Sequence, residues 1–199
     1  MICTCAWVIV LLLFVLFDVN YFIRIAFTVG TGRIFNKKRK SLLEVSTIYG
    51  ICTFQDIDIA LKHMNNARFL RELDFARFYY WDSTALYAGI CKRGGNAVQG
   101  ASMTRYRKTI GIFTPFKITT KLIYWDDKNI YLEHQFISIP DGFVRAVGLS
   151  KQTTFGLKVS VDEILQELEP GIEKPQMTKE LQLWLDTMEE SSQKLKKRN

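Results

Sequence analysis

The chain has 199 residues, of which 48% are hydrophobic and 13% aromatic, so it is long enough for one domain with a sizeable core. The net charge of +7 is basic without being extreme, and we expect no nucleic-acid partner. The cysteines follow no zinc-binding spacing, so we expect free thiols in a reducing compartment, no metal site and no cofactor: Cys3, Cys5, Cys52 and Cys91.

Residues 1–23 are the most apolar part of the chain, without a charged side chain between Ile2 and Phe17. As one helix, residues 2–23 would measure about 33 Å, which is enough to span a bilayer with Asp18 near the headgroups. A cleaved signal peptide, which would make the protein secreted, normally needs a basic start and a small-residue cleavage site, and both are missing. A buried core helix would be unusually free of polar residues. We therefore predict an N-terminal membrane anchor or signal-like segment.

Residues 24–40 are predicted to form a basic linker, with four consecutive basic residues at 37–40. Positive charge on this side of the anchor predicts that the rest of the protein faces the cytosol. The cluster either contacts anionic headgroups or only sets topology, and the sequence leaves both open. Lys196 and Lys197 lie four and three places from the C-terminus, which resembles a dilysine retrieval signal. We therefore expect the endoplasmic-reticulum membrane.

The predicted domain spans residues 41–158 and contains both strand and helix patterns. Residues 45–54 are rich in β-branched and aromatic residues, which is typical of a strand. Residues 67–80 carry an apolar stripe at helical spacing and more aromatic residues on other sides, so this helix should be covered on more than one face. After a short helix and loop, strand patterns joined by polar turns cover 97–106, 116–125, 130–139 and 143–155. This order predicts an α+β fold, with an antiparallel sheet wrapped round a central helix.

Two helices are predicted in the C-terminal region, residues 159–199, which ends in a basic tail. A capping box formed by Ser160 and Glu163 begins the first helix, and Pro170-Gly171 ends it. The second is amphipathic, with apolar residues at i, i+3, i+4 and i+7 spacing: Leu181, Trp184, Leu185 and Met188. We predict that both helices pack against the domain; the alternative for the second is a partner- or membrane-binding helix.

Polar side chains crowd the loop before the long helix: Asp56, Asp58, His63, Asn65 and Asn66. A carboxylate in such a loop can attack a thioester or ester carbonyl, or activate a water that does so. The nearby helix N-terminus can hold the developing oxyanion. The alternative is structural, with the aspartates capping the loop and an asparagine capping the helix. Serine-hydrolase, P-loop and dinucleotide-binding motifs are missing, and the only other histidine, His134, lies in a strand pattern and is predicted to be structural.

The pattern D-x-D followed by H-M-N-N-A-R-F-L-R-E-L-D-F-A-R resembles the active-site loop and central helix of 4-hydroxybenzoyl-CoA-thioesterase-like hotdog proteins. Over roughly residues 10–190 the chain is similar to their thioesterase superfamily member 6 group, and W-D-D and P-D-G-F match that group too. The resemblance implies a hotdog fold, an acyl-CoA or related acyl-thioester ligand, and a homodimer with sites at the subunit interface.

The resemblance also implies roles for individual residues of the loop. Asp58, the second aspartate of D-x-D, would be the nucleophile or general base. His63 and Asn65 would position a water or polarise the carbonyl, with Asp56 and Asn66 in support.

Two acids on the central helix, Glu72 and Asp74, lie where other hotdog branches place a catalytic carboxylate. Asp74 and Arg77 are three residues apart, and we favour a structural ion pair for them. The loop departs from the family pattern at Lys62, which stands in place of the usual glycine before the histidine. Two functions therefore remain open: a membrane-anchored acyl-CoA thioesterase, or an inactive hotdog protein that binds acyl chains or partner proteins and influences lipid homeostasis.

Overall fold

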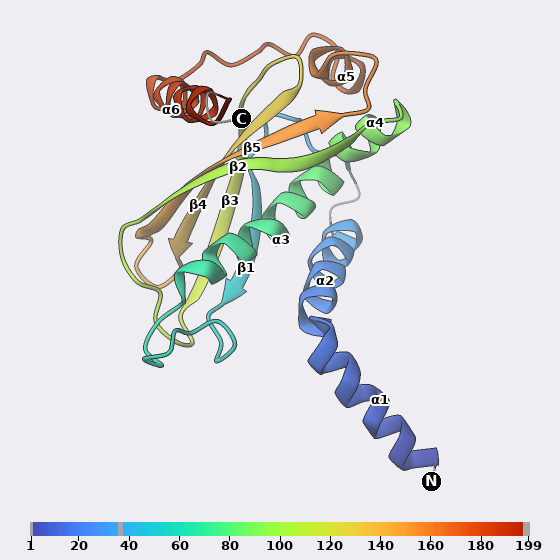
Figure 1. Cartoon of the computed structure of the whole chain (residues 1–199), viewed down its shortest axis with the longest axis vertical. Coiled ribbons are helices and arrows are strands. Elements are labelled where there is room, and N and C mark those ends of the chain that lie inside the picture. The colour runs from blue at the N-terminus through green and yellow to red at the C-terminus, as the bar shows by residue number, and fades with distance from the viewer. Residues whose placement is uncertain (1, 36–37, 197–199) are drawn as a thin grey trace.

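The computed structural model describes residues 2–35 and 38–196, which form six helices and one five-stranded sheet, with the N-terminal helix extending away from the sheet (Figure 1). Helices α1 (Ile2–Leu16) and α2 (Val19–Phe35) form an N-terminal arm. The central helix α3 (Asn66–Thr84) is followed by the short helix α4 (Leu86–Lys92). Helices α5 (Val161–Leu168) and α6 (Lys179–Lys196) complete the C-terminal region.

The sheet is antiparallel throughout and has the strand order β1-β3-β4-β5-β2. Strands β3, β4 and β5 are neighbours in sequence and in space, so the predicted meander is confirmed. Strand β2 pairs with β5 at the end of the sheet, with a bulge between Gln99 and Ala101. The strand bounds are β1 (Ser46–Ile51), β2 (Asn96–Tyr106), β3 (Pro115–Trp125), β4 (Asn129–Ser138) and β5 (Val144–Phe155).

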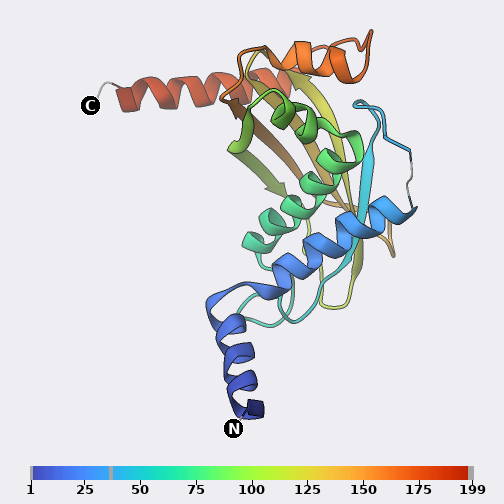
Figure 2. The ribbon, with the colours of Figure 1, turned by 90° about the vertical axis from the view of Figure 1, so that its right-hand side faces the viewer.

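Helix α3 lies across one face of the curved sheet, which is the predicted α+β hotdog arrangement (Figure 2). It begins at the cap residue Asn65 and ends at Ala85, which adopts a left-handed φ of 59°. The predicted apolar stripe is buried except for Leu70, which is 41% exposed, and Phe75 and Tyr79 are buried on another side of the helix. This second buried side exists because α2 packs against α3, so the helix is covered on more than one face, as predicted.

The arm is not the single helix that we predicted for residues 2–23. Helix α1 ends at Leu16 and α2 begins at Val19. Between them, Oδ1 of Asp18 accepts a hydrogen bond from the backbone N–H of Tyr21 at 3.1 Å. This carboxylate satisfies a free N–H at the start of α2, which favours a new helix over continuation of the first. Among the described residues, no helix is both long and apolar enough to cross a membrane.

Residues 24–35, which we assigned to a basic linker, belong to α2 and pack against the domain. Tyr21 and Ile25 contact the core cluster that contains α3 residues. At Gly32 the two helices approach so closely that a Cβ atom would lie 2.4 Å from Cε2 of Tyr79. The part of the chain that the sequence suggested was a flexible connection is therefore docked on the central helix, because its apolar and small residues recur at helical spacing.

Helix α6 covers the face of the sheet opposite α3. Its residues Leu181 and Trp184 form a buried cluster with Tyr131 of β4 and Leu149 of β5. Successive strand residues point to opposite faces, and the neighbours of Tyr131 belong to the core on the α3 side. The predicted capping box of α5 is present at Ser160. The prediction that both C-terminal helices pack on the domain is confirmed.

Two cysteines within the described residues are free thiols, as predicted: Cys52 is buried and Cys91 is exposed. Burial raises the pKa of the Cys52 thiol to about 11, and the nearby acids Asp56 and Glu72 add to this effect. Cys52 is therefore protonated and unreactive at neutral pH. The side chains of Cys3 and Cys5 lie outside the described part of the chain.

Candidate functional site

The loop between β1 and α3 is shaped by backbone pairing that brings Asp58 next to His63. The N–H of Asp58 donates to the carbonyl of His63 at 2.9 Å, and the chain turns between them at Leu61, which has a φ of 55°. His63 also pairs with Gly111, so the loop is attached to the segment before β3. The two residues therefore meet although four residues separate them.

Asp58 and His63 form the part of the predicted site that is open to solvent. Oδ2 of Asp58 lies 3.7 Å from Nε2 of His63, and their side chains are 21% and 38% exposed. Desolvation works to raise the pKa of Asp58, but the N–H of Lys62, the nearby His63 and the N–H groups of His63 and Ala60 lower it overall. A partly exposed carboxylate that stays ionised beside an imidazole can act as a general base or nucleophile.

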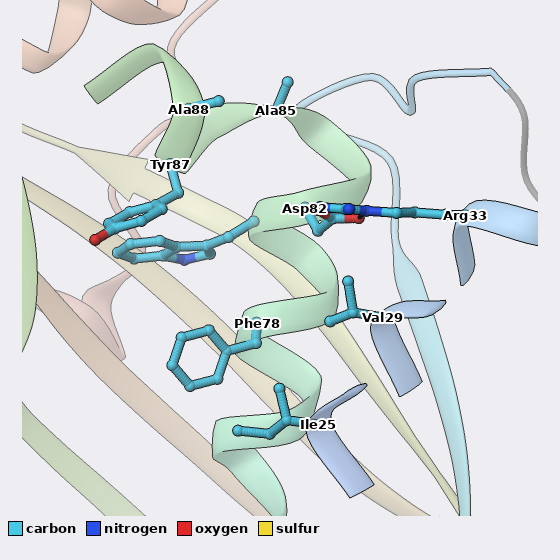
Figure 3. Close-up of a pocket in the computed structure, with 9 residues that line it drawn as sticks. Ile25, Val29, Arg33, Phe78, Asp82, Ala85, Tyr87 and Ala88 are labelled. Atoms are coloured by element: carbon cyan, nitrogen blue, oxygen red, sulfur yellow. Dashed lines mark hydrogen bonds and ion pairs between the residues drawn. The ribbon is translucent and has the colours of Figure 1, made fainter. Parts of the chain in front are cut away.

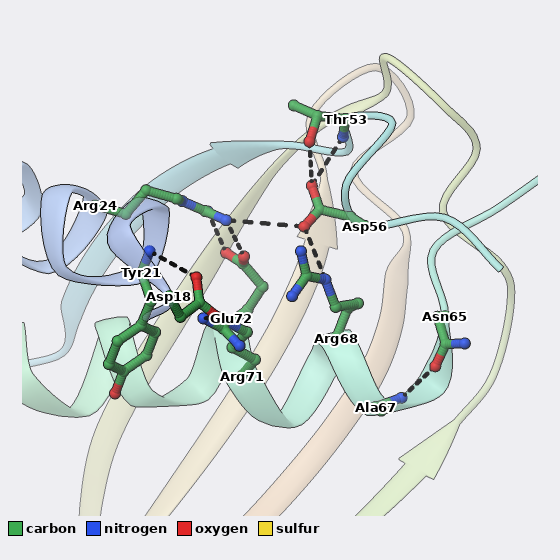
Figure 4. Close-up of polar contacts among 10 residues, drawn as sticks. All are labelled: Asp18, Tyr21, Arg24, Thr53, Asp56, Asn65, Ala67, Arg68, Arg71 and Glu72. Carbon is green, nitrogen blue, oxygen red and sulfur yellow. Dashed lines mark hydrogen bonds and ion pairs between the residues drawn. The ribbon is translucent and has the colours of Figure 1, made fainter. Parts of the chain in front are cut away.

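Asn65 caps the central helix, which confirms the structural alternative for its oxygen atom. Oδ1 of Asn65 accepts the N–H of Ala67 at 2.9 Å, and the amide nitrogen points away from the helix (Figure 4). The carbonyl of Asn66 accepts the hydroxyl of Tyr106 at 3.0 Å. The helix end is thus joined to the end of β2, and only the NH₂ group of Asn65 remains for other contacts.

Asp56 is almost fully buried, at 1% exposure, and cannot contact a substrate directly. Its Oδ2 accepts the N–H and the hydroxyl of Thr53 at 2.9 and 2.7 Å (Figure 4). Its Oδ1 lies 3.3 Å from Nε of Arg68 and 3.8 Å from Nη1 of Arg24. The contact with Arg68 is an ion pair rather than a hydrogen bond, since the Nε–H finds no acceptor. Asp56 therefore fixes the start of the loop.

Glu72 is buried under the arm and holds Arg24 of α2. Nη1 of Arg24 lies 2.6 Å from Oε1 of Glu72, and Nη2 donates to Oε2 at 2.8 Å (Figure 4). Burial raises the pKa of Glu72, while the charge and hydrogen bonds of Arg24 oppose that rise. Both carboxylate oxygens are occupied, so Glu72 is not available as a base in this arrangement.

Asp74, the other acid predicted on α3, forms the expected ion pair with Arg77. Nη2 of Arg77 donates to Oδ1 of Asp74 at 2.6 Å, which confirms the structural alternative. The hydroxyl of Tyr21 on α2 donates to Oδ2 at 3.4 Å. Asp74 therefore helps to hold the arm on the central helix. The predicted residues separate into two groups: Asp58 with His63, and Asp56 with Glu72 around Arg24.

A small cavity of about 230 Å³ adjoins the loop. Two cations that follow β2 are among its lining residues, which are Met64, Asn66, Phe69, Tyr106, Arg107, Lys108 and Thr109. The guanidinium of Arg107 and the ammonium of Lys108 lie 4.8 and 5.6 Å from the centre of the Phe143 ring. These contacts hold both side chains against Phe143, and the two residues give the lining of the cavity a positive charge that favours an anionic group.

A second cavity, of about 320 Å³, lies between α2 and α3 (Figure 3). Most of its lining is apolar, from Ile25 and Val29 on α2 and Phe78 on α3. At its rim Nε of Arg33 donates to Oδ2 of Asp82 at 3.0 Å. This cavity lies beside the C-terminal half of α3, whereas the loop with Asp58 precedes the N-terminus of that helix. None of the predicted site residues lines it.

His134 is structural, as predicted. Its ring nitrogens lie 2.9 Å from the hydroxyl of Thr120 and 3.0 Å from that of Ser150, and the side chain is buried. Burial, together with the positive charge of Arg77, lowers the pKa of His134 to about 3. The imidazole is therefore neutral at physiological pH. Within residues 2–35 and 38–196, no group of three or more metal-binding side chains is suited to hold an ion.

The sequence alone does not identify the cations around Asp56 and Glu72. Arg24 lies in the predicted basic linker, and Arg68 lies on the predicted central helix. Arg107 and Lys108 form a basic pair after a strand, a pattern that is also typical of solvated surface. For Arg24 one signal was available: Asp18, Tyr21 and Arg24 recur every third residue, which places them near one another on a helix.

Comparisons with known proteins agree with this architecture. Residues 52–185 match the family described as the thioesterase-like superfamily. Protein THEM6 of Drosophila melanogaster is 58% identical over 193 residues, which cover 96% of this chain and 98% of that protein.

Two solved structures illustrate the shared fold. The 1,4-dihydroxy-2-naphthoyl-CoA thioesterase of Synechocystis aligns with a TM-score of 0.55 at 10% identity, covering 66% of this chain and 100% of its own. A Staphylococcus aureus protein solved in complex with CoA aligns with a TM-score of 0.52 at 14% identity, covering 72% and 96%. At these identities the likeness concerns the fold alone.

Proposed function

This chain belongs to the thioesterase-like superfamily, in the group that contains the THEM6 proteins, and we propose that it is a membrane-anchored thioesterase that hydrolyses acyl-CoA in lipid metabolism. The observation that carries the proposal is the pair of Asp58 and His63, 3.7 Å apart and partly open to solvent, in the loop whose later residues Met64 and Asn66 line a cavity. Within the loop, Asp58 is the predicted acid that is partly exposed and not engaged by an arginine; Asp74, on the central helix, is paired with Arg77.

The proposed reaction uses this pair as follows. Asp58 removes a proton from a water molecule, whose oxygen bonds to the thioester carbonyl carbon. The tetrahedral intermediate collapses as the carbon–sulfur bond breaks, which releases the carboxylic acid and the CoA thiolate. His63, when protonated, supplies a proton to the departing sulfur. Direct attack by the Asp58 carboxylate, followed by hydrolysis of the anhydride, is the other route that these residues support.

The charges near the cavity support CoA as the group that carries the acyl chain. CoA bears phosphates, and Arg107 and Lys108 provide two cations beside the loop. Binding pockets for whole drug-sized ligands typically occupy about 300–1,000 Å³, so a cavity of about 230 Å³ suits part of the molecule. We propose that the acyl-thioester end lies near Asp58 and that the phosphates lie toward these cations.

The apolar arm supports a location at a membrane. Helix α1 exposes large apolar side chains, such as Trp7 and Val15, each at 70% exposure. Contiguous exposed apolar surface is characteristic of membrane and protein contacts. We propose that α1 anchors the protein at the endoplasmic-reticulum membrane with the hotdog domain facing the cytosol, and that the protein is a homodimer, as the family resemblance implies. Resistance of the full-length protein to carbonate extraction tests the anchor, and sedimentation tests the dimer.

A second candidate function is an inactive hotdog protein that binds acyl chains or partner proteins. The observation that favours it is the state of the other acids: Asp56 and Glu72 are 1% and 2% exposed and are engaged by arginines. Only Asp58 is left for chemistry in the loop. This candidate predicts that acyl-CoA binds without being hydrolysed.

A turnover assay separates the two candidates. Purified full-length protein in detergent is tested against acyl-CoA of several chain lengths, beside the Asp58→Asn variant. Asp127→Asn is the matched control, because it removes an exposed acid from the β3–β4 turn. The enzyme candidate predicts hydrolysis that Asp58→Asn abolishes and Asp127→Asn preserves. Binding without hydrolysis across the panel supports the second candidate and rejects the first.

A further inference from the structure

We propose that Arg24 is a positioning residue that couples the docking of α2 to the geometry of the loop carrying Asp58 and His63. The contacts of Arg24 support this coupling, and its importance for catalysis rests on the proposed function. Arg24 belongs to the arm, whereas its partners belong to the central helix and to the loop (Figure 4). This one side chain thus links three parts of the chain: the arm, the central helix and the loop.

Arg24 is held firmly in place. It contacts both oxygens of Glu72, at 2.6 and 2.8 Å, and its guanidinium carbon lies 4.5 Å from the centre of the Phe75 ring. A two-pronged contact fixes the orientation of a guanidinium as well as its position. In that orientation Nη1 also faces Oδ1 of Asp56 at 3.8 Å. Arg24 is therefore the counter-charge that contacts both buried acids, whereas Arg68 forms an ion pair with Asp56.

Asp56 transmits this contact to the loop. Its carboxylate receives two hydrogen bonds from Thr53, and its carbonyl accepts the N–H of Asn65 at 2.8 Å. Asp56 thereby joins the first and last residues of the loop, and Asp58 is only two residues further along. If the charge opposite Asp56 moves, the position of Asp56 changes. The two loop residues bonded to it, Thr53 and Asn65, then have to move as well.

The other polar contacts between arm and domain involve α3 alone. Asp18 pairs with Arg71, Tyr21 bonds to Asp74, and Arg33 pairs with Asp82. Among the ion pairs made by described residues of α2, that of Arg24 is the one that also reaches the loop. Loss of the Arg24 charge while the arm stays docked would leave two buried carboxylates with one remaining arginine, an arrangement that proteins resist strongly. Docking of the arm and order in the loop are therefore linked.

Histidine NMR provides a direct test, because the chain contains two histidines. His63 reports on the loop, and His134, bonded to Thr120 and Ser150 in the sheet, reports on the fold. Imidazole spectra of the full-length protein in micelles are recorded at pH 7 for wild type and Arg24→Gln. We expect the His63 resonances to shift and broaden while those of His134 stay unchanged.

Three further variants make the result specific. Glu72→Gln added to Arg24→Gln removes the uncompensated buried charge, so the His63 resonances should move back toward wild type. Arg24→Lys keeps the charge but loses the two-pronged contact, so a smaller shift is expected. Arg33→Gln breaks an ion pair at the far end of α2, with Asp82, and should leave His63 unchanged.

The proposal is overturned if His63 keeps its wild-type resonances in Arg24→Gln, or if Arg33→Gln shifts them equally. If Arg24→Gln also alters His134, the same criteria apply to Arg24→Lys and to the double variant, which retain charge balance. No substrate is present in these spectra, so they decide the coupling even for a protein that hydrolyses no acyl-CoA. If hydrolysis is measurable, kcat should fall in Arg24→Lys with KM nearly unchanged.

Discussion

Arg24 and Glu72 are 48 residues apart in the sequence, yet Nη1 and Nη2 of Arg24 contact Oε1 and Oε2 of Glu72, at 2.6 and 2.8 Å. This contact joins the second helix of the arm, α2, to the central helix of the hotdog domain, so α2 is a packed element and not a linker. It also removes one candidate catalytic acid from the accessible site, because Glu72 is 2% exposed. The open chemistry of the loop is left to Asp58 and His63.

The docking of the arm can be tested with two glycines of the same helix. A Cβ added to Gly32 would lie 2.4 Å from the Tyr79 ring, whereas one added to Gly30 meets no atom within 4 Å. Gly30→Ala should stabilise the helix by up to about 1 kcal/mol, and Gly32→Ala should destabilise the protein by about 1–3 kcal/mol. Thermal unfolding in micelles should show Tm shifts of opposite sign. Equal shifts for the two variants would contradict the docked arrangement.

The cap of the central helix depends on Asn65. Replacing it with alanine removes the acceptor for the N–H of Ala67 and should cost about 1 kcal/mol, or a Tm loss of about 2–4 °C. Asn65→Ser retains a capping oxygen and should keep most of the stability. If Asn65→Ser is stable but loses hydrolysis, the free NH₂ group takes part in the chemistry. A serine variant as unstable as the alanine variant would argue against the cap.

The buried His134 should make the stability of the folded protein sensitive to acid. Its pKa falls from the ordinary 6.5 to about 3 in the folded protein, because burial and Arg77 disfavour the charged form. Its neutral form therefore contributes stability that is present above pH 6.5 and is lost as the pH falls toward 3. The loss should be about 1.4 kcal/mol per pH unit, or about 2 kcal/mol between pH 6.5 and 5.

Urea unfolding at pH 6.5 and 5 measures this difference. His134→Gln should reduce the change in unfolding free energy between these two pH values by about 2 kcal/mol. The comparison between wild type and variant cancels the titration of the carboxylates that both share. An unchanged slope in His134→Gln would refute the assignment.

The cations beside the cavity should contribute to CoA binding. Removing Arg107 and Lys108 together should weaken CoA binding by about 2- to 30-fold, since exposed charge contacts contribute about 0.2–1 kcal/mol each. Calorimetry at low and high salt should show the difference shrinking as salt screens the phosphates. The control removes the same charge from exposed positions outside the cavity, Lys121→Ala with Lys158→Ala. If both double variants weaken CoA binding equally, the effect comes from the net charge of the protein and not from cations at the cavity.

Local patterns predicted most of the fold. The cap at Asn65, the capping box at Ser160 and the apolar stripe of α3 are interactions between residues within about four positions of one another. The break between α1 and α2 at Asp18 is also a local feature, but the pattern did not predict it. The Asp18 carboxylate caps α2, and an aspartate at this position equally suits a membrane interface. Hydropathy alone therefore overestimated the length of the first helix.

By itself the sequence determined the hotdog domain, its family and the loop in which to look for chemistry, because periodicity, caps and turn residues act over a few neighbouring positions. The tertiary structure decided which acids in and beside that loop are accessible. Burial and charge pairing depend on which distant segments meet. Asp56 and Glu72 are enclosed because α2 brings Arg24 to them, and Asp58 stays open because no element covers it to the same extent.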